Sequence, residues 1–246
     1  MAKRLLDRQI SLLDYLTSGA AIFGDKRRAA LDPELQGLDV GLLRLEARFS
    51  YEKRMEKIVG VFPHTFELLG HDQAAIVREF VRTCPPVDIG HLTNARQFHD
   101  FLSARWRRRR PKPPYLPDVA ACELACATVG AAVDADLRET ADGRKGVPPG
   151  AIRRKQGVVL LRCRYDVRPI FEGGSARAVP EKRDTALAVA IMPGAARPQV
   201  FELPAAIYDL LAALDDWSDP AALHATPGSA ELVRELARHG LLEVRS

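Results

Sequence analysis

The chain has 246 residues, of which 47% are apolar and 28% charged, and its formal net charge is +4. This composition is that of a globular protein and argues against wholesale disorder. No window approaches the roughly 18 uninterrupted apolar residues of a membrane span, and charged residues interrupt the N-terminal stretch, so we expect a cytoplasmic protein that makes no use of a membrane.

The first half of the chain predicts helices. Apolar residues recur at helical spacing over residues 5–16, 42–62, 76–81, 98–102 and 119–133, and glycines or prolines separate most of these segments. No sustained alternation of period two occurs before residue 150. We therefore predict an all-helical bundle over residues 1–141.

A linker rich in Gly, Pro and charged residues is predicted over residues 142–156. Beyond it, strand-like segments occur at residues 158–161, 167–171, 186–192 and 199–203. Three short helices follow, the second beginning at Asp219-Pro220 and holding Leu223, and the third running from Ser229 to His239. The fold class is thus α+β: a helical bundle, then a winged helix-turn-helix over residues 157–246, with three or four strands and three helices.

Cysteines and histidines do not form a recognisable site in the sequence. The four cysteines lack the spacing of a zinc site or of a disulfide framework. Cys122 and Cys126 share one face of a predicted helix, where we favour two small core residues over half of a metal or redox site. No phosphate-binding loop, HExxH or GxSxG motif is present. We expect no catalytic residue, metal or cofactor in this chain.

A basic run is the strongest local signal, and it consists of Arg105, Trp106, Arg107, Arg108, Arg109 and Arg110. It is compatible with contact to a nucleic acid, in which the arginines neutralise phosphates and the tryptophan stacks. It is also compatible with docking of a partner protein, or with a solvated helix end. The sequence leaves these three interpretations open.

The charge of the C-terminal module separates two uses of a winged helix. Residues 200–246 contain eight acidic and three basic side chains. The charged residues of the predicted third helix, Glu231, Arg234, Glu235 and Arg238, cancel one another. A recognition helix that approaches DNA phosphates is normally rich in Lys and Arg, so we do not expect this helix to read bases.

Strand addition is the other use of such a fold, in which an extended peptide pairs with an exposed strand edge. The expected receiving strand comprises Gln199, Val200, Phe201, Glu202 and Leu203. The expected contributors from the third helix are Val233, Arg234, Leu236 and Arg238. Because proline has no N–H, Phe201→Pro is expected to remove a donor from the ladder that holds the peptide.

Motifs in the first half support a family resemblance. In chain order they are Phe62-Pro63, Leu68-Leu69-Gly70, Phe80-Val81, Pro85-Pro86, Phe98 with Phe101-Leu102, and Tyr115-Leu116-Pro117-Asp118-Val119-Ala120 with Glu123. Residues from about 48 to 125 thereby resemble the N-terminal domain of the partner proteins, of the HvfC/BufC type, that accompany multinuclear non-heme iron-dependent oxidative enzymes.

A second group of motifs lies near the C-terminus. It comprises Phe201-Glu202-Leu203, Ile207-Tyr208-Asp209-Leu210-Leu211, Leu214-Asp215-Asp216-Trp217, Leu232-Val233-Arg234-Glu235-Leu236 and His239-Gly240-Leu241-Leu242-Glu243. This stretch is similar to the PqqD-like precursor-recognition element of ribosomal peptide pathways.

The two resemblances imply a role. In such systems a separate iron enzyme modifies cysteines of a ribosomally made precursor peptide, giving oxazolone and thioamide groups, thiooxazoles, or excision of a carbon from a C-terminal cysteine. They imply that this chain is a non-catalytic subunit, forms a heterodimer with the enzyme and presents the precursor's cysteine to it, with the iron in the enzyme. The basic run is then a candidate docking surface. The alternative is a DNA-binding transcriptional regulator that uses this run.

Overall fold

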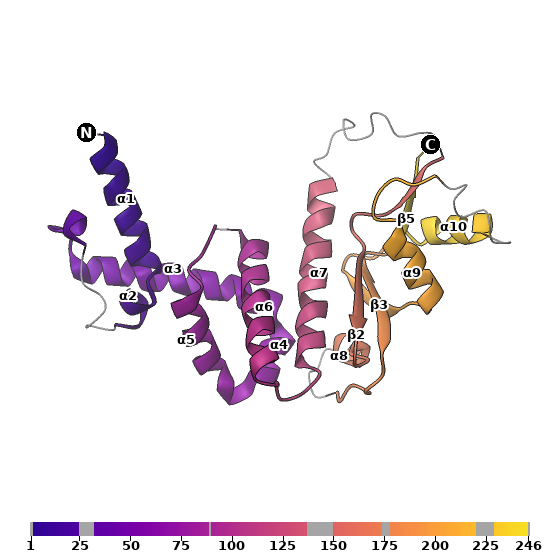
Figure 1. The fold of residues 1–246 in the computed structure, drawn as a ribbon, viewed down its shortest axis with the longest axis horizontal. Helices are drawn as coiled ribbons and strands as arrows, with labels where there is room; N and C mark the ends of the chain where they lie inside the picture. Colours follow the sequence, from indigo (N-terminus) through magenta and orange to yellow (C-terminus); the bar gives the residue numbers. More distant parts are fainter. Residues whose placement is uncertain are drawn as a thin grey trace. The chain divides into compact units, whose positions relative to one another are not determined.

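A computed structural model describes residues 2–24, 32–88, 90–136, 150–173, 178–219 and 229–245. The chain divides into two compact units, Met1–Arg110 and Pro111–Ser246, and the strands belong to the second (Figure 1). The protein is therefore of mixed α+β class with a helical first part, as the sequence predicts. No helix in the described ranges is long and apolar enough to cross a membrane.

The first unit is built from helices and two single turns. They are α1 (Ala2–Thr17), α2 (Gly19–Phe23), η1 (Pro33–Leu35), α3 (Val40–Val61), α4 (Pro63–Leu69), η2 (Gly70–Asp72), α5 (Gln73–Thr83) and α6 (His91–Arg108). Side-chain caps explain several starts. Ser18 accepts the N–H groups of Ala20 and Ala21 at the start of α2, and Asp39 accepts that of Gly41 at the start of α3.

Phenylalanine rings form the centre of the first unit. Phe98 of α6 lies 5.0 Å from the ring of Phe80, 5.3 Å from Phe66 and 5.7 Å from Phe62, measured between centroids. Phe62, Phe80 and Phe98 are fully buried. Phe62, Phe80 and Phe98 are thus core residues that join α5 and α6 to the end of α3, and Phe66 adds α4.

Arg54 of α3 is anchored beside this core by neutral acceptors. Its guanidinium lies 4.6 Å from the Phe80 ring centroid. It donates hydrogen bonds to Asn94 Oδ1 (2.8 Å), the Cys84 carbonyl (3.0 Å) and Gln97 Oε1 (2.6 Å). Burial lowers the pKa of Arg54 to about 10. This side chain ties α3 to the start of α6.

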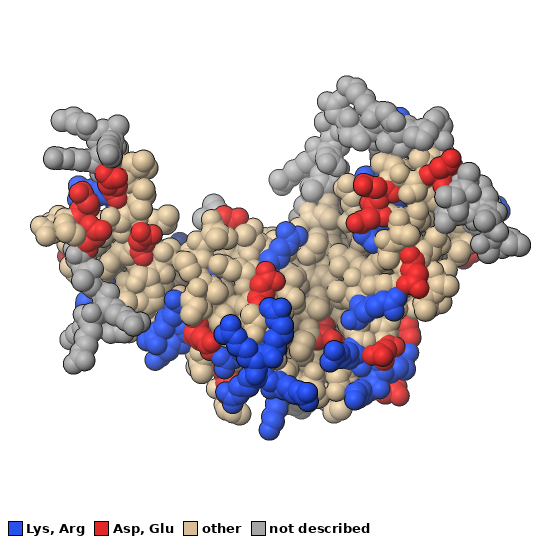
Figure 2. Space-filling model, in the orientation of Figure 1, with Lys and Arg blue, Asp and Glu red and all other residues tan. Residues whose placement is uncertain are grey.

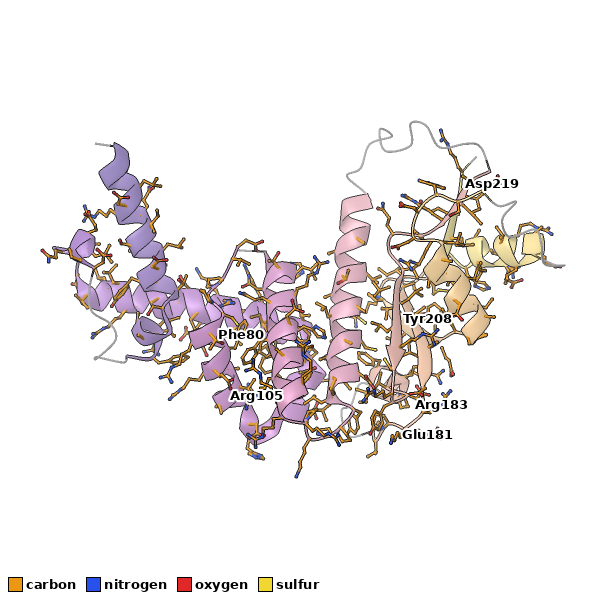
Figure 3. All side chains as sticks on the ribbon, viewed as in Figure 1. Phe80, Arg105, Glu181, Arg183, Tyr208 and Asp219 are labelled. Atoms are coloured by element: carbon orange, nitrogen blue, oxygen red, sulfur yellow. The ribbon has the colours of Figure 1, made fainter. Side chains whose placement is uncertain are left out.

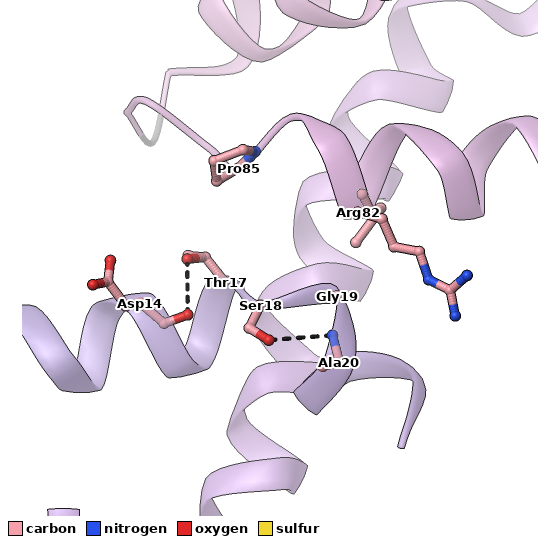
Figure 4. Close-up of a pocket in the computed structure, with 8 residues that line it drawn as sticks. Asp14, Thr17, Ser18, Gly19, Ala20, Arg82 and Pro85 are labelled. Carbon is pink, nitrogen blue, oxygen red and sulfur yellow. Dashed lines mark hydrogen bonds between the residues drawn. The ribbon is translucent and has the colours of Figure 1, made fainter. Parts of the chain in front are cut away.

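Gly19 allows α2 to approach α5 closely, beside a hollow of about 470 Å³ (Figure 4). A Cβ at Gly19 would lie 2.8 Å from Arg82 Cγ and 3.1 Å from Arg82 Cα. Because backbone must shift to accept it, we expect Gly19→Ala to lower the free energy of unfolding by about 1–2 kcal/mol in urea denaturation.

Gly60→Ala is the matched control. Gly60 lies in α3 with no atom within 4 Å of such a Cβ. The free energy of unfolding of this variant is therefore expected to rise by up to about 1 kcal/mol. Equal effects of the two substitutions would contradict this explanation.

The second unit contains the sheet. Its elements are α7 (Leu116–Asp136), β1 (Ile152–Arg154), β2 (Val159–Cys163), α8 (Arg168–Gly173), β3 (Thr185–Ala190), β4 (Gln199–Glu202), α9 (Ala205–Ala213), α10 (Ser229–Arg238) and β5 (Leu242–Val244). Strands β2, β3 and β4 form an antiparallel sheet in that order, and β1 pairs with β5 in a separate antiparallel ladder.

The central sheet is covered on both faces. Alternate residues of a strand face opposite sides, and the two sides pack into different clusters. One cluster joins Val189 and Val200 to Ala125 and Val129 of α7. The other contains residues of the opposite parity and of the C-terminal helices: Leu160, Ala188, Phe201, Leu203, Leu211, Leu232, Val233 and Leu236. The sheet is therefore enclosed between α7 and the helices that follow β4.

Three predicted features differ in the structure. The predicted strand 167–171 is wrong, because Asp166 Oδ1 accepts the N–H of Arg168 at 3.3 Å and Pro169 lies in the first turn, so the chain forms α8 instead. The predicted linker 142–156 contains β1, whose partner β5 is distant in sequence. The predicted domains 1–141 and 157–246 differ from the compact units, because α7 packs on the sheet of the second unit. The helix predicted around Pro220 and Leu223 lies outside the described residues.

Candidate functional site

Strand β4 is an edge strand. It pairs with β3 on one side, in a register that places Phe201 opposite Ala188 and Val200 opposite Val189. The strand that the sequence analysis assigned to the peptide, Gln199–Leu203, thus pairs with β3 on one side. On its other side no described strand pairs with it, and α8 contacts β4.

The register identifies which main-chain groups face outward. The N–H of Leu203 donates to the carbonyl of Ala186 at 2.8 Å, which continues the ladder beyond β4. Hydrogen-bonded and non-hydrogen-bonded pairs alternate along an antiparallel ladder. Gln199, Phe201 and Leu203 therefore exchange hydrogen bonds with β3. Val200 and Glu202 direct their N–H and C=O groups away from it.

The expectation about Phe201→Pro therefore needs correction. The N–H of Phe201 faces Ala188 within the sheet, so a proline there would weaken the internal ladder and not the outer edge. The donors available to an added strand are those of Val200 and Glu202.

An ion network lies at the C-terminal end of β4. Arg168 donates to Asp166 Oδ2 (2.6 Å) and Glu202 Oε2 (2.7 Å), and Arg183 donates to Asp166 Oδ2 (2.7 Å) and Glu202 Oε2 (3.1 Å). Figure 3 shows Arg183 at one end of the sheet, near Glu181. Two arginines thus bridge two carboxylates, and Glu202 is held in place while its main chain remains at the edge.

The network lowers the pKa of both carboxyls. Hydrogen bonds from Arg168, and then from Arg183, lower the pKa of Asp166 to about 2 against the opposing effect of burial. A hydrogen bond from Arg183 likewise lowers the pKa of Glu202. Sequence reasoning missed Asp166, Arg168 and Arg183, because Arg183 and Arg168 lie 19 and 34 residues from Glu202 and only the fold brings them together.

The residues predicted on the third helix have different environments. Leu236 is buried in the core cluster and Val233 is half-buried against it. Arg234 and Arg238 are exposed. Arg238 donates to Glu235 Oε1 at 2.6 Å, and this interaction lowers the pKa of Glu235. Of this set, Arg234 and Arg238 have side chains at the surface, whereas Leu236 is a core residue.

The basic run lies at the end of α6. Arg105 forms an ion pair with Glu79 of α5, and Trp106 is half-buried. Arg107, Arg108, Arg109 and Arg110 are exposed, and Figure 2 shows Lys and Arg side chains gathered over the lower end of α6. The run therefore presents cations at the surface of the first unit.

Cys122 and Cys163 meet in the interior of the second unit. Both are buried, and a hydrogen bond between their side chains, together with burial, raises the pKa of Cys122 well above its usual value. Burial also raises the pKa of Cys126 to about 11. The thiols of Cys122 and Cys126 on α7 are therefore protonated at neutral pH. No group of three or more metal-ligating side chains occurs in the described part of the chain.

A comparison of this chain with protein-family models found no match, and a comparison with curated proteins found none either. Its activity must therefore be inferred from the free edge of β4, the ion network at its end and the motifs of the sequence.

Proposed function

We propose that this chain is a non-catalytic subunit that binds a ribosomally synthesised precursor peptide by strand addition and presents its cysteine to a partner multinuclear iron oxidative enzyme. The observation that supports it is the side of β4 that no described strand pairs with, toward which Val200 and Glu202 direct their main-chain groups. An extended peptide satisfies such groups with its own N–H and C=O groups.

The order of elements supports a winged helix-turn-helix in the second unit. Three antiparallel strands precede α9 and α10, and β5 follows them. In this interpretation β4 is the receiving strand, and α10 contributes Arg234 and Arg238 to the recognition of peptide side chains. Phe201 of β4 and Val233 of α10 already share one core cluster, which is consistent with neighbouring positions for the strand and the helix.

Binding to both the precursor and the enzyme would raise the effective concentration of the reacting cysteine at the iron site. The chain itself then needs no catalytic group. The exposed arginines at positions 107–110 are our candidate contact with the enzyme.

The charge state of α10 favours a peptide over duplex DNA as the ligand of the second unit. Arg238 is paired with Glu235, and His239 lies 3.5 Å from the same carboxylate. A helix that carries such internal compensation offers little free positive charge to phosphates.

Calorimetric titration of the full chain with the cysteine-containing precursor encoded beside it tests the proposal. Saturable binding in the micromolar range or tighter, retained in the presence of the partner enzyme, is expected. Absence of binding to every neighbouring precursor, with and without the enzyme, would overturn it.

A second candidate, a transcriptional regulator, is favoured by the exposure of Arg107–Arg110. It requires affinity for duplex DNA that falls steeply with salt and is lost when these four arginines become glutamines. The same substitutions would leave precursor binding unchanged if the peptide occupies β4.

A further inference from the structure

Two pairs of arginines face the same aromatic side chains in the first unit. Arg44 and Arg48 are four residues apart on α3, and Arg78 and Arg82 are four residues apart on α5. Residues at this spacing lie on one face of a helix, where like charges repel. Each helix therefore carries an unfavourable pair of cations on the side where α2 contacts it.

The aromatic side chains are Phe23 of α2 and Tyr51 of α3. Their ring centroids are 5.6 Å apart and the rings are inclined by 69°. The Arg78 guanidinium lies 5.2 Å from the centroid of Phe23, and that of Arg82 lies 6.0 Å from it. The ring holds these two arginines in place by cation–π attraction while their N–H groups stay available for a ligand.

Two hollows are lined by this aromatic pair. One, of about 500 Å³, is lined by Phe23 and Tyr51 together with Arg44 and Arg48. The other, of about 580 Å³, is lined by the same two rings together with Arg78. Each of the two hollows thus combines an aromatic wall with at least one arginine.

Among the described residues that line these hollows, Glu52 of the first hollow is the one carboxylate beside the arginines. Arg48 lies 3.9 Å from Glu52, and both side chains are more than half exposed. Arg78 and Arg82 form no ion pair with any described residue, and Nε of Arg44 is buried without a hydrogen-bond partner. Cations held close together, with their donors unused, are an arrangement that suits an anion.

We propose that this arginine cleft, formed by Arg44, Arg48 and Arg78 around Phe23 and Tyr51 with Arg82 beside Phe23, binds an acidic segment of a partner protein with one carboxylate in each hollow. A guanidinium pairs with a carboxylate through two parallel hydrogen bonds, and an arginine stacked on a ring loses less freedom when it does so. Two hollows that share one aromatic pair suit two carboxylates of one extended segment better than a single small anion.

A nucleic acid fits this cleft less well. Binding of a single strand depends on bases that stack on free aromatic faces. Arg78 and Arg82 already lie over Phe23, and both rings are half-buried. All residues of the cleft belong to the first unit, so the proposal is independent of the peptide site on β4.

Fluorescence anisotropy of labelled hexaglutamate with the full chain tests the proposal. Binding is expected to weaken at least about tenfold in Arg44→Gln/Arg78→Gln, which removes one cation from each hollow. The matched control is Arg107→Gln/Arg108→Gln, which removes the same charge from the exposed run and is expected to change affinity less than about twofold. Ring resonances of Phe23 and Tyr51 are expected to shift on titration of the wild-type chain.

Equal weakening by the two double variants would show general attraction to polyanions and overturn the proposal. So would saturable binding of inorganic tripolyphosphate or of a 12-nucleotide oligothymidylate at the cleft when hexaglutamate does not bind there. Thermal unfolding of both variants at the wild-type temperature would show that the loss reflects binding and not folding.

Discussion

Val200→Pro is expected to lower affinity for the precursor peptide at least about tenfold while the chain stays folded. Val200 directs its N–H away from β3, so proline removes one of the two donors at the free edge. The lost hydrogen bond accounts for about 1 kcal/mol, and the ring obstructs the approaching strand in addition, which together reach the 1.4 kcal/mol of a tenfold change. Proline is tolerated on edge strands, because no internal ladder bond is lost there.

Two controls sharpen this experiment. Val200→Ala keeps the outward N–H and is expected to bind within about threefold of the wild-type chain, because main-chain pairing does not depend on the side chain. Phe201→Pro is expected to lower the temperature of unfolding, because its N–H faces Ala188. Wild-type affinity in Val200→Pro would show that the peptide binds elsewhere.

Asp166→Asn is expected to destabilise the chain by about 2 kcal/mol at pH 7. Asp166 is 8% exposed and accepts hydrogen bonds from both Arg168 and Arg183. Its pKa falls from an ordinary 3.8 to about 2 in the folded chain, and each unit of pKa corresponds to 1.36 kcal/mol. The charged carboxylate therefore stabilises the fold fully above about pH 4, and the contribution is lost as the pH falls towards 2.

Urea denaturation at pH 7 and near pH 2.5 measures this effect. The difference in free energy of unfolding between the wild type and Asp166→Asn is expected to be smaller at the lower pH, because the wild-type carboxyl becomes partly protonated. Asp209→Asn is the control: Asp209 pairs with Arg162 at 2.6 Å, but both side chains are more than 60% exposed, so the cost is expected to stay below about 1 kcal/mol. A pH-independent difference for Asp166→Asn would contradict the role given to the charge.

The sequence predicted most element positions but not their partners. Apolar spacing located α3, α5 and α6, and the strand-like stretch at residues 199–203 coincides with β4. The predicted apolar stripe of α7 is buried at Val119, Cys122 and Val129. Periodicity identifies such a face but does not say what covers it, and the sheet that covers this one lies further along the chain.

The sequence was sufficient to predict which strand forms the candidate site. Which of its N–H groups face outward depends on the register with β3, and a shift of one residue exchanges the two sets. The arginine cleft was not predicted, because Arg44 and Arg78 become neighbours of Phe23 only through the contacts of α2 with α3 and α5. The spacing of four residues within each arginine pair was the available signal.

The pairing of β1 with β5 decides where this protein can be cut or fused. Ile152 lies opposite Val244, the N–H of Arg245 donates to the carbonyl of Ala151 at 2.9 Å, and Ile152 is 1% exposed. Deleting the last strand would uncover that isoleucine and unpair Arg153 from Glu243. A fragment of the second unit should therefore keep both β1 and β5.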